Sequence, residues 1–121
     1  MRLSRKPKSF KENYSFESRL EESTRIMAKY PDRVPVIIEK SNDTDIPEID
    51  RKKFLVPNDV QLSQLMYIIR KRIKIAPEKS IYLFINSKLI NGSQFMASIY
   101  ENCKDKDGFL YVTYAGENTF G

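Results

Sequence analysis

Apolar residues occur at helical spacing in the first third of this chain, where charged residues separate them. Those of residues 15–30 are Phe16, Leu20, Ile26, Met27 and Tyr30. This spacing predicts a helix with one apolar face. Ser15 is a suitable N-cap, and Pro31 ends the helix because it disfavours helical geometry at the preceding residue. Residues 9–13 are expected to form a single helical turn ahead of it.

The next apolar segments are too short for typical helices. The sequence VPVIIEK over 34–40 is rich in β-branched residues and predicts a buried strand, and the polar residues 41–50 predict a loop. A second strand is expected over 53–56, because aromatic, aliphatic and β-branched residues follow one another there. These segments therefore predict a pair of strands joined by a polar loop.

Several features indicate that the 53–56 strand lies at the edge of its sheet. Pro57 cannot donate a hydrogen bond to a neighbouring strand, and lysines such as Lys52 and Lys53 are typical of sheet edges. An exposed edge has unpaired N–H and C=O groups, so a peptide can bind there as one additional strand. We interpret this strand as a peptide-docking edge; an ordinary strand is the plainer alternative for the same pattern.

The second half of the chain predicts one clear helix and several short elements. The helix is indicated by apolar residues at i, i+3, i+4, i+7 and i+11 from Leu62; the cap-type residues Asn58 and Asp59 precede it, and Pro77 limits it. The further elements are a central strand over 81–85, a short strand over 89–90, a brief helix over 95–103, a KDKDG turn over 104–108 and a last strand over 109–114.

This order of elements predicts an α+β fold, a sheet with helices on one face. Three segments are expected: a basic N-terminal arm with a short helix over 1–14, a folded domain over 15–114 and a flexible C-terminal tail over 115–121. The cations of the arm are Arg2, Arg5, Lys6, Lys8 and Lys11. Such an arm is usually only solvated, and the alternative is contact with a membrane or a partner.

The composition fits one soluble domain and excludes several classes of function. The chain has 121 residues, 40% of them hydrophobic and 12% aromatic, and no apolar run approaches the ~20 residues of a membrane span. The single cysteine, Cys103, cannot form an internal disulfide, which favours the reducing cytoplasm. The chain has no histidine, which excludes Ser-His and Cys-His nucleophile pairs; no enzyme, metal site or cofactor is expected.

The charge of the chain favours anionic partners without choosing among them. The net charge of +5 comes from 21 Lys and Arg against 16 Asp and Glu, and it would attract acidic lipid, acidic peptide or nucleic acid. A nucleic-acid binder is one alternative, because IRKRI over 69–73 and the arm supply cations. No nucleic-acid motif accompanies these cations, and the aromatic residues occupy mostly core-like positions, so nucleic acid is not an expected partner.

Five segments of the chain resemble the autophagy ubiquitin-like modifiers, the family of the light-chain-three and GABARAP proteins. They are YPDRVPVI over 30–37, DIPEIDRKKFLVP over 45–57, IRKRI over 69–73, KDKDGFLYVTY over 104–114 and ENTFG over 117–121. The resemblance runs in the same order from about Ser9 to Gly121. It implies a ubiquitin-like β-grasp with two additional N-terminal helices, which agrees with the order of elements above.

Members of this family bind a short linear motif as an added strand, with one aromatic and one aliphatic residue separated by two others. The resemblance therefore implies two pockets beside the 53–56 strand. The aromatic pocket would use Glu22, Ile26, Pro35, Ile37, Lys53, Leu55 and Phe109. The aliphatic pocket would use Phe54, Val56, Pro57, Val60, Leu65, Ile68 and Arg72. Acidic residues beside the motif would meet Arg33, Lys53 and Arg72.

The resemblance also implies chemistry at Gly121. In this family an activating enzyme adenylates the C-terminal glycine, a conjugating enzyme receives it as a thioester, and it is finally joined to phosphatidylethanolamine. Glycine suits this role because it has no Cβ and presents an unhindered carboxyl carbon. Many relatives carry residues after this glycine that a processing or deconjugating cysteine protease removes. Gly121 is the last residue of the sequence, and it is either the encoded end, a processed end or the end of a chosen fragment.

These implications describe a lipid-anchored adaptor. It would act in autophagosome formation and bind motif-bearing cargo receptors and autophagy machinery. It would be cytoplasmic when free, and on the autophagosomal membrane, in transport to the vacuole or lysosome, when lipidated. The closest alternative is a pure binding module that keeps the docking edge and is never conjugated.

Overall fold

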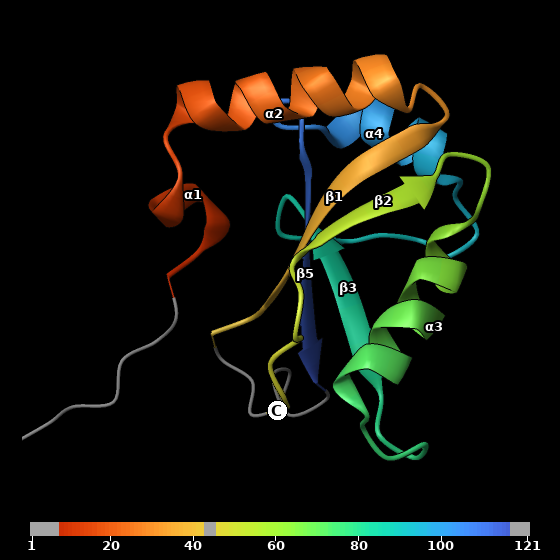
Figure 1. Ribbon diagram of the computed structural model, residues 1–121. Helices are drawn as coiled ribbons and strands as arrows, with labels where there is room; N and C mark the ends of the chain where they lie inside the picture. The colour runs from red at the N-terminus through yellow and green to blue at the C-terminus, as the bar shows by residue number, and fades with distance from the viewer. Residues whose placement is uncertain (1–7, 43–45, 117–121) are drawn as a thin grey trace, which may run out of the picture.

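The computed structural model describes residues 8–42 and 46–116, and they form a five-stranded mixed sheet in the order β2-β1-β5-β3-β4 (Figure 1). β1 pairs antiparallel with β2 and parallel with β5, and β3 pairs antiparallel with both β5 and β4. The strands are β1 (Arg33–Lys40), β2 (Lys53–Pro57), β3 (Ile81–Ile85), β4 (Lys88–Leu89) and β5 (Leu110–Gly116).

Helices cover both faces of this sheet. They are α1 (Phe10–Asn13), α2 (Phe16–Lys29), α3 (Leu62–Ile73) and α4 (Met96–Cys103). The main core lies between the sheet and α3 and α4, whereas α1 and α2 lie over the opposite face. The prediction of helices on one face only was therefore wrong, and the two N-terminal helices account for the difference.

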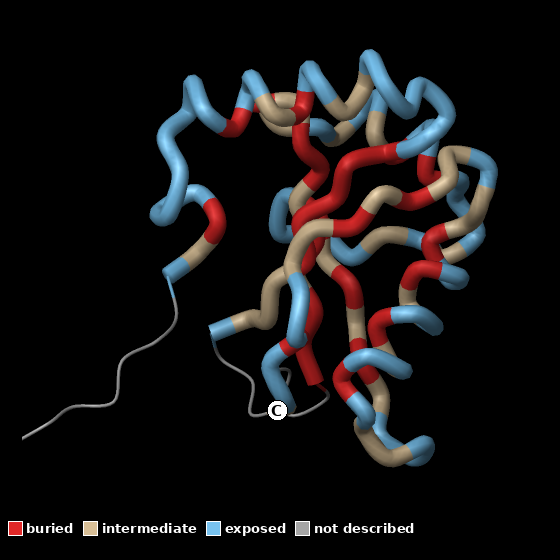
Figure 2. Tube along the Cα trace, in the orientation of Figure 1, coloured by how far each residue is buried: buried red, intermediate tan, exposed pale blue. Residues whose placement is uncertain are grey.

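The main core explains why the short apolar runs form strands. Alternate residues of β1, β2, β3 and β5 enter this core, and they pack against one face of α3 at Leu62, Leu65, Ile69 and Ile73. β1 is buried on both faces over residues 34–38 (Figure 2). Alternation follows because successive side chains of a strand point to opposite faces of the sheet. β3 is buried at Ile81, Leu83 and Ile85, and it lies between β5 and β4, as expected of an interior strand.

A second, smaller cluster lies under the N-terminal helices. Phe10, Ile37 and Phe109 are buried in it, with Ile26 and Tyr111 packed against them. The Phe10 and Phe109 rings meet edge to face, with centroids 5.2 Å apart, a favourable arrangement of two aromatic rings. Ser9 caps α1, as its side chain accepts a hydrogen bond from the Glu12 N–H.

The inward face of α2 differs from the one that its apolar spacing predicts. Phe16, Leu20 and Tyr30 are 41%, 40% and 37% exposed, so they do not form the packed face. The buried residues of this helix are Arg19 and Ser23 instead. Ser15 does cap the helix as expected, accepting a hydrogen bond from the Ser18 N–H. Polar partners on the body of the domain replace apolar packing here.

Two boundaries in the second half also differ from expectation. The N-cap of α3 is Gln61, whose N–H donates to the Gln64 side chain, so Asn58 and Asp59 were wrongly expected as caps. β5 continues to Gly116, because Ala115 and Gly116 pair with Tyr82 and Ile81. The predicted tail thus begins two residues too early, and its remainder, 117–121, lies outside the described residues. Most of the predicted arm, 1–7, lies outside them as well.

Candidate functional site

β2 is an edge strand. Among the described residues it pairs with β1 and with no other strand, and it is the first strand in the order of the sheet. The Ile38 N–H donates to the Lys52 carbonyl at 2.8 Å, and the Asn58 N–H donates to the Asp32 carbonyl at 3.0 Å. Hydrogen-bonded and non-bonded pairs alternate along an antiparallel ladder. The backbone groups of Lys53, Leu55 and Pro57 therefore point away from β1, along the open side.

Both faces of the sheet flank this open side, because successive residues of β2 alternate between them. Phe54 and Val56 point into the main core beneath α3. Lys53 and Leu55 point toward the face that carries α1 and α2, opposite Ile37 and Pro35 of β1. β2 thus lies between the residues predicted for the two pockets. We call the residues predicted for the aromatic pocket the aromatic set, and those predicted for the aliphatic pocket the aliphatic set.

The aromatic set lies on the side of α2. Ile37 and Phe109 are fully buried in the small cluster, Pro35 is buried beside it, and Ile26 of α2 packs against it. Glu22, Lys53 and Leu55 are half-buried. The Lys53 ammonium donates a hydrogen bond to the Glu22 carboxylate, so an ion pair joins α2 to β2. The structure places all seven residues of this set on one side of the sheet.

The aliphatic set lies on the side of α3 and reaches from the core to the surface. Val56 and Leu65 are buried and Phe54 is 8% exposed, whereas Ile68 and Arg72 are exposed. Val60 packs against the core at its margin, and Pro57 is half-buried at the end of β2.

Arg72 lies at the exposed end of this set. Its guanidinium pairs with Asp50 and lies 5.7 Å from the centroid of the Phe54 ring. A cation over an aromatic face is attracted by the ring. Arg72 is thereby held near the Phe54 ring, between α3 and Asp50.

Two arginines bind the outward carbonyls of β2. Arg33 Nη1 donates to the Leu55 carbonyl at 3.2 Å, and Arg51 Nε donates to the Lys53 carbonyl at 3.2 Å. The Arg51 guanidinium also lies 5.2 Å from the centroid of the Phe54 ring. Both arginines are exposed. Within residues 8–42 and 46–116 no second strand pairs with this edge, but side chains bind the carbonyls of Lys53 and Leu55.

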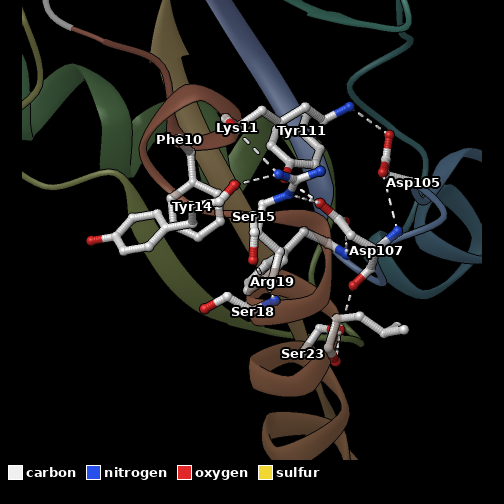
Figure 3. Close-up of polar contacts among 12 residues, drawn as sticks. Phe10, Lys11, Tyr14, Ser15, Ser18, Arg19, Ser23, Asp105, Asp107 and Tyr111 are labelled. Carbon is white, nitrogen blue, oxygen red and sulfur yellow. Dashed lines mark hydrogen bonds and ion pairs between the residues drawn. The ribbon is translucent and has the colours of Figure 1, made fainter.

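A buried polar network, which we call the Asp107 latch, holds α2 on the domain (Figure 3). Asp107 is fully buried, and its carboxylate accepts hydrogen bonds from Arg19 Nε at 2.7 Å, the Tyr111 hydroxyl at 2.5 Å and the Phe109 N–H at 2.9 Å. The Ser23 hydroxyl donates to the Asp107 carbonyl at 2.5 Å. The latch thereby connects the KDKDG turn to α2 through Arg19 and Ser23, and to β5 through Tyr111.

The N-terminal helices supply further acceptors to the same cation. Arg19 Nη1 donates to the Tyr14 carbonyl at 2.6 Å and to the Lys11 carbonyl at 3.3 Å. The Lys11 side chain pairs separately with the turn, since its Nζ donates to Asp105 at 2.7 Å. The hydrogen bond to Asp107 raises the pKa of Arg19 against the effect of burial. Burial, followed by the hydrogen bond to Asp107, raises the pKa of the Tyr111 hydroxyl. Both side chains therefore keep their protons at neutral pH.

Sequence reasoning missed this network. KDKDG was predicted only as a turn, and neither Arg19 nor Ser23 was singled out. The available signal was their spacing, since residues 19, 23 and 26 lie at i, i+4 and i+7 and thus on one face of a helix. Arg19 and Ser23 share this face with the apolar Ile26. Two polar residues on a packed helix face indicate polar partners in the part of the domain that the helix contacts.

The described residues offer no sign of a membrane-crossing element or a metal site. Within 8–42 and 46–116, no helix has the length and apolar character needed to cross a bilayer. The same residues contain no group of three or more His, Cys, Asp or Glu side chains suited to a metal ion. Cys103 is half-buried in α4, and Gly121 lies outside the described residues.

A mixed sheet in the order β2-β1-β5-β3-β4 with α3 packed across one face defines a ubiquitin-like protein, here with two helices added at the N-terminus. The crystal structure of Trypanosoma brucei ATG8 is similar to this chain, with a TM-score of 0.88 and 41% sequence identity. The similarity covers 96% of this chain and 100% of that one. The ubiquitin-like fold and its N-terminal helices are thus confirmed.

Relatives and a family model identify the group. The model "Autophagy protein Atg8 ubiquitin like" matches residues 18–121. Autophagy-related protein 8 of Mycosarcoma maydis is 58% identical over 113 residues, or 93% of this chain and 96% of its own. The protein of the same name from Schizosaccharomyces pombe is 56% identical over 112 residues, or 93% of each chain. The chain belongs to the Atg8 family, the ubiquitin-like modifiers of autophagy.

Proposed function

We propose that this modifier binds aromatic-x-x-aliphatic motifs as a strand added to β2. The observation that carries the proposal is the open side of β2, along which Lys53 and Leu55 direct their backbone groups. Side chains of an added strand alternate between the faces of the sheet. The aromatic residue of the motif would lie toward Glu22 and Ile26, and the aliphatic residue toward Ile68 and Arg72 on the other side.

The interactions available at this edge match a micromolar affinity. Burying an aromatic and a leucine-like side chain contributes about 1.5–3 kcal/mol each. Each backbone hydrogen bond contributes about 0.5–1.5 kcal/mol net. Ordering the peptide and losing its free motion offset part of this sum, and we expect a Kd in the micromolar range, where 1 μM corresponds to about −8 kcal/mol.

Calorimetric titration of a motif peptide against Leu55→Ala tests the proposal. Leu55 is half-buried at the centre of the open strand, so its removal should lower the affinity at least tenfold while the domain stays folded. Leu89→Ala is the matched control, because Leu89 is an exposed leucine of β4, the strand at the opposite edge. Equal affinities of the two variants would contradict docking at β2.

We further propose that Gly121 is the residue joined to phosphatidylethanolamine. The ENTFG sequence over 117–121 and membership of the Atg8 family support this assignment. Amide formation would replace a carboxylate by two acyl chains, and each buried CH₂ contributes about 0.8 kcal/mol to membrane binding. Two chains suffice for stable anchoring, so conjugation would convert the free modifier into a membrane-bound adaptor.

A reconstituted conjugation reaction tests this second proposal. Gly121→Ala adds a methyl group beside the reacting carbonyl, and we expect lipid attachment to be at least tenfold slower with the fold intact. A Gly116→Ala variant does not serve as a control, since Gly116 pairs with Ile81 inside β5. Gly92→Ala does, because Gly92 lies in a loop where an added Cβ meets Ser63 only at 3.4 Å or beyond. Normal lipidation of Gly121→Ala would refute the assignment.

These activities define the partners of the protein. It would be a substrate of activating and conjugating enzymes and of a deconjugating cysteine protease, and it would catalyse nothing itself. Its motif-bearing partners would be cargo receptors and autophagy machinery. It would lie in the cytoplasm when free and on the autophagosomal membrane when lipidated.

A further inference from the structure

A groove at the end of α3 plays no part in the proposed motif binding. It has a volume of about 400 Å³, and the residues that line it are Tyr67, Arg70, Lys71, Lys74, Ile75 and Pro77. Ligand pockets usually measure about 300–1,000 Å³, so this groove is large enough to take an aromatic side chain. None of the lining residues belongs to the aromatic set or the aliphatic set.

One wall of the groove is held in place by Arg70. Its guanidinium donates to the carbonyls of Ala76 and Pro77 at 3.2 Å each and to the Lys79 carbonyl at 2.7 Å. These hydrogen bonds keep the segment that follows α3 against the helix. The wall is therefore built by the chain itself before any ligand arrives.

The open side of the groove is aromatic and basic. Tyr67 is 62% exposed, and Lys71 Nζ lies 5.1 Å from the centroid of its ring. Lys74 is exposed at the end of α3, and the half-buried Ile75 adds apolar surface. An aromatic side chain with a carboxylate nearby matches such a surface, because ring packs on ring and the cations attract the acid.

The C-terminal tail leaves the sheet next to this groove. β3 and β5 are antiparallel with Ile81 opposite Gly116, so the residues before Ile81 and those after Gly116 continue from the same end of the sheet (Figure 1). Pro77 is four residues before Ile81. Phe120 is four residues after Gly116. Four residues span at most about 14 Å, so the groove wall and the tail have equal reach from neighbouring starting points.

We propose that this groove binds the chain's own C-terminal tail, 117–121, which lies outside the described residues. Phe120 would pack against Tyr67, and Glu117 would lie near the two lysines of the groove. In the form that the proposed conjugation requires, Gly121 also ends in a carboxylate, and in this respect the inference rests on the proposed function. The tail would have to leave the groove before an enzyme could act on Gly121.

Nuclear magnetic resonance of the full chain tests this docking. We expect nuclear Overhauser contacts between the Phe120 ring and the Ile75 methyl groups. The Tyr67 ring resonances should shift in Phe120→Ala. Lys71→Glu should lower the docked fraction about two- to fivefold, because the acidic tail then meets a like charge. The control Lys88→Glu makes the same change in net charge at an exposed lysine of β4 and should leave the contacts unchanged.

Salt and dilution complete the test. In 1 M salt the Debye length falls to about 3 Å, so the contacts should weaken. Dilution should leave them unchanged, because the groove and the tail belong to one chain. Contacts that fade on dilution would mean that the tail of a second copy fills the groove, and they would overturn the proposal.

Two other results would also overturn it. One is the absence of the contacts, together with Tyr67 resonances that do not respond to Phe120→Ala. The other is an equal effect of Lys71→Glu and Lys88→Glu. These measurements use neither an enzyme nor a lipid, so a failure of docking is distinguishable from a failure of the proposed conjugation.

Discussion

The Asp107 latch makes Asp107→Asn a sharp test of how the N-terminal helices are held. In the unmodified protein the Phe109 N–H donates to Asp107 Oδ1. Asparagine has nearly the same shape as aspartate and keeps one carbonyl oxygen that can accept this hydrogen bond. The other oxygen, which accepts from Arg19 Nε and the Tyr111 hydroxyl, is lost as an acceptor of the cation. The substitution therefore leaves the Arg19 guanidinium without its counterion.

The magnitude follows from burial. Asp107 is fully buried and the Arg19 side chain is 10% exposed, so water cannot easily replace the lost partner. Breaking a buried ion pair on one side costs about 3–5 kcal/mol. The carbonyl groups of Tyr14 and Lys11 still accept from Arg19, which favours the lower end of this range. We expect a loss of about 3 kcal/mol in the free energy of unfolding.

Urea unfolding measures this loss, with Asp105→Asn as the matched control. With a slope of about 2 kcal/mol per M, the midpoint of Asp107→Asn should fall by about 1.5 M. Asp105 lies in the same turn and also pairs with a cation, but the side chains of Lys11 and Asp105 are 46% and 29% exposed. A partly exposed ion pair contributes about 1 kcal/mol or less, and an asparagine at 105 keeps a carbonyl oxygen that can accept the Asp107 N–H, so the control should shift the midpoint by less than about 0.5 M.

Two results would refute this reasoning. The first is a loss below about 1 kcal/mol for Asp107→Asn, which would show that the pair is solvated. The second concerns Arg19→Met combined with Asp107→Asn. If Asp107→Asn destabilises the domain because Arg19 stays buried without its counterion, replacing Arg19 as well should restore some stability. The double variant should then lose less free energy of unfolding than the two single variants added together. Strictly additive losses would contradict the role assigned to the charge.

Two further predictions concern the neighbouring turn and the core. Gly108→Ala should destabilise the domain by about 3 kcal/mol in urea unfolding, because Gly108 has φ +89° and an added Cβ would lie 2.2 Å from Ser23 Oγ. The control Gly92→Ala should change the free energy of unfolding by less than about 0.5 kcal/mol, because an added Cβ there meets no atom closer than 3.4 Å. Burial raises the pKa of Tyr114 to about 12, and its hydroxyl donates to the Pro47 carbonyl. At pH 8, Tyr114→Phe should be about 1 kcal/mol less stable. Tyrosine ionises near pH 10 in the unfolded chain but near pH 12 in the folded one, so the unmodified protein loses stability as the pH rises from 10 to 12. The difference in free energy of unfolding between the unmodified protein and Tyr114→Phe should therefore be smaller at pH 11 than at pH 8. A difference that stays constant would contradict this.

The elements that sequence could predict are those with a strong local pattern. The edge position of β2 followed from the lysines and Pro57 beside a short apolar run, and the structure confirms it. The apolar face of α3 was predicted from its spacing, and Leu62, Leu65, Ile69 and Ile73 are buried as expected. In both cases the information lies within a few residues of the element itself.

The orientation of α2 could not be predicted in the same way. Its apolar residues suggested a packed face that includes Phe16 and Leu20, but both are about 40% exposed. The buried face instead carries Arg19, whose partner Asp107 lies 88 residues away along the chain. A charged residue is buried only where a distant counterion accepts it, and no local pattern reports that partner.

The latch and the proposed docking edge are connected through α2. This helix carries Arg19 and Ser23 on the face that binds the KDKDG turn. It also pairs Glu22 with Lys53 of β2 and packs Ile26 against the small cluster. The sheet alone provides the open strand β2. Without α2, the aromatic set on one face of the sheet would lose Glu22 and Ile26. Hydrogen bonds require particular distances and angles, so the bonds of Arg19 and Ser23 to Asp107 restrict where α2 can lie on the sheet. The buried polar network therefore helps to set the geometry of the aromatic set, and Phe109 belongs to both, since its N–H donates to Asp107 while its ring lies in the small cluster.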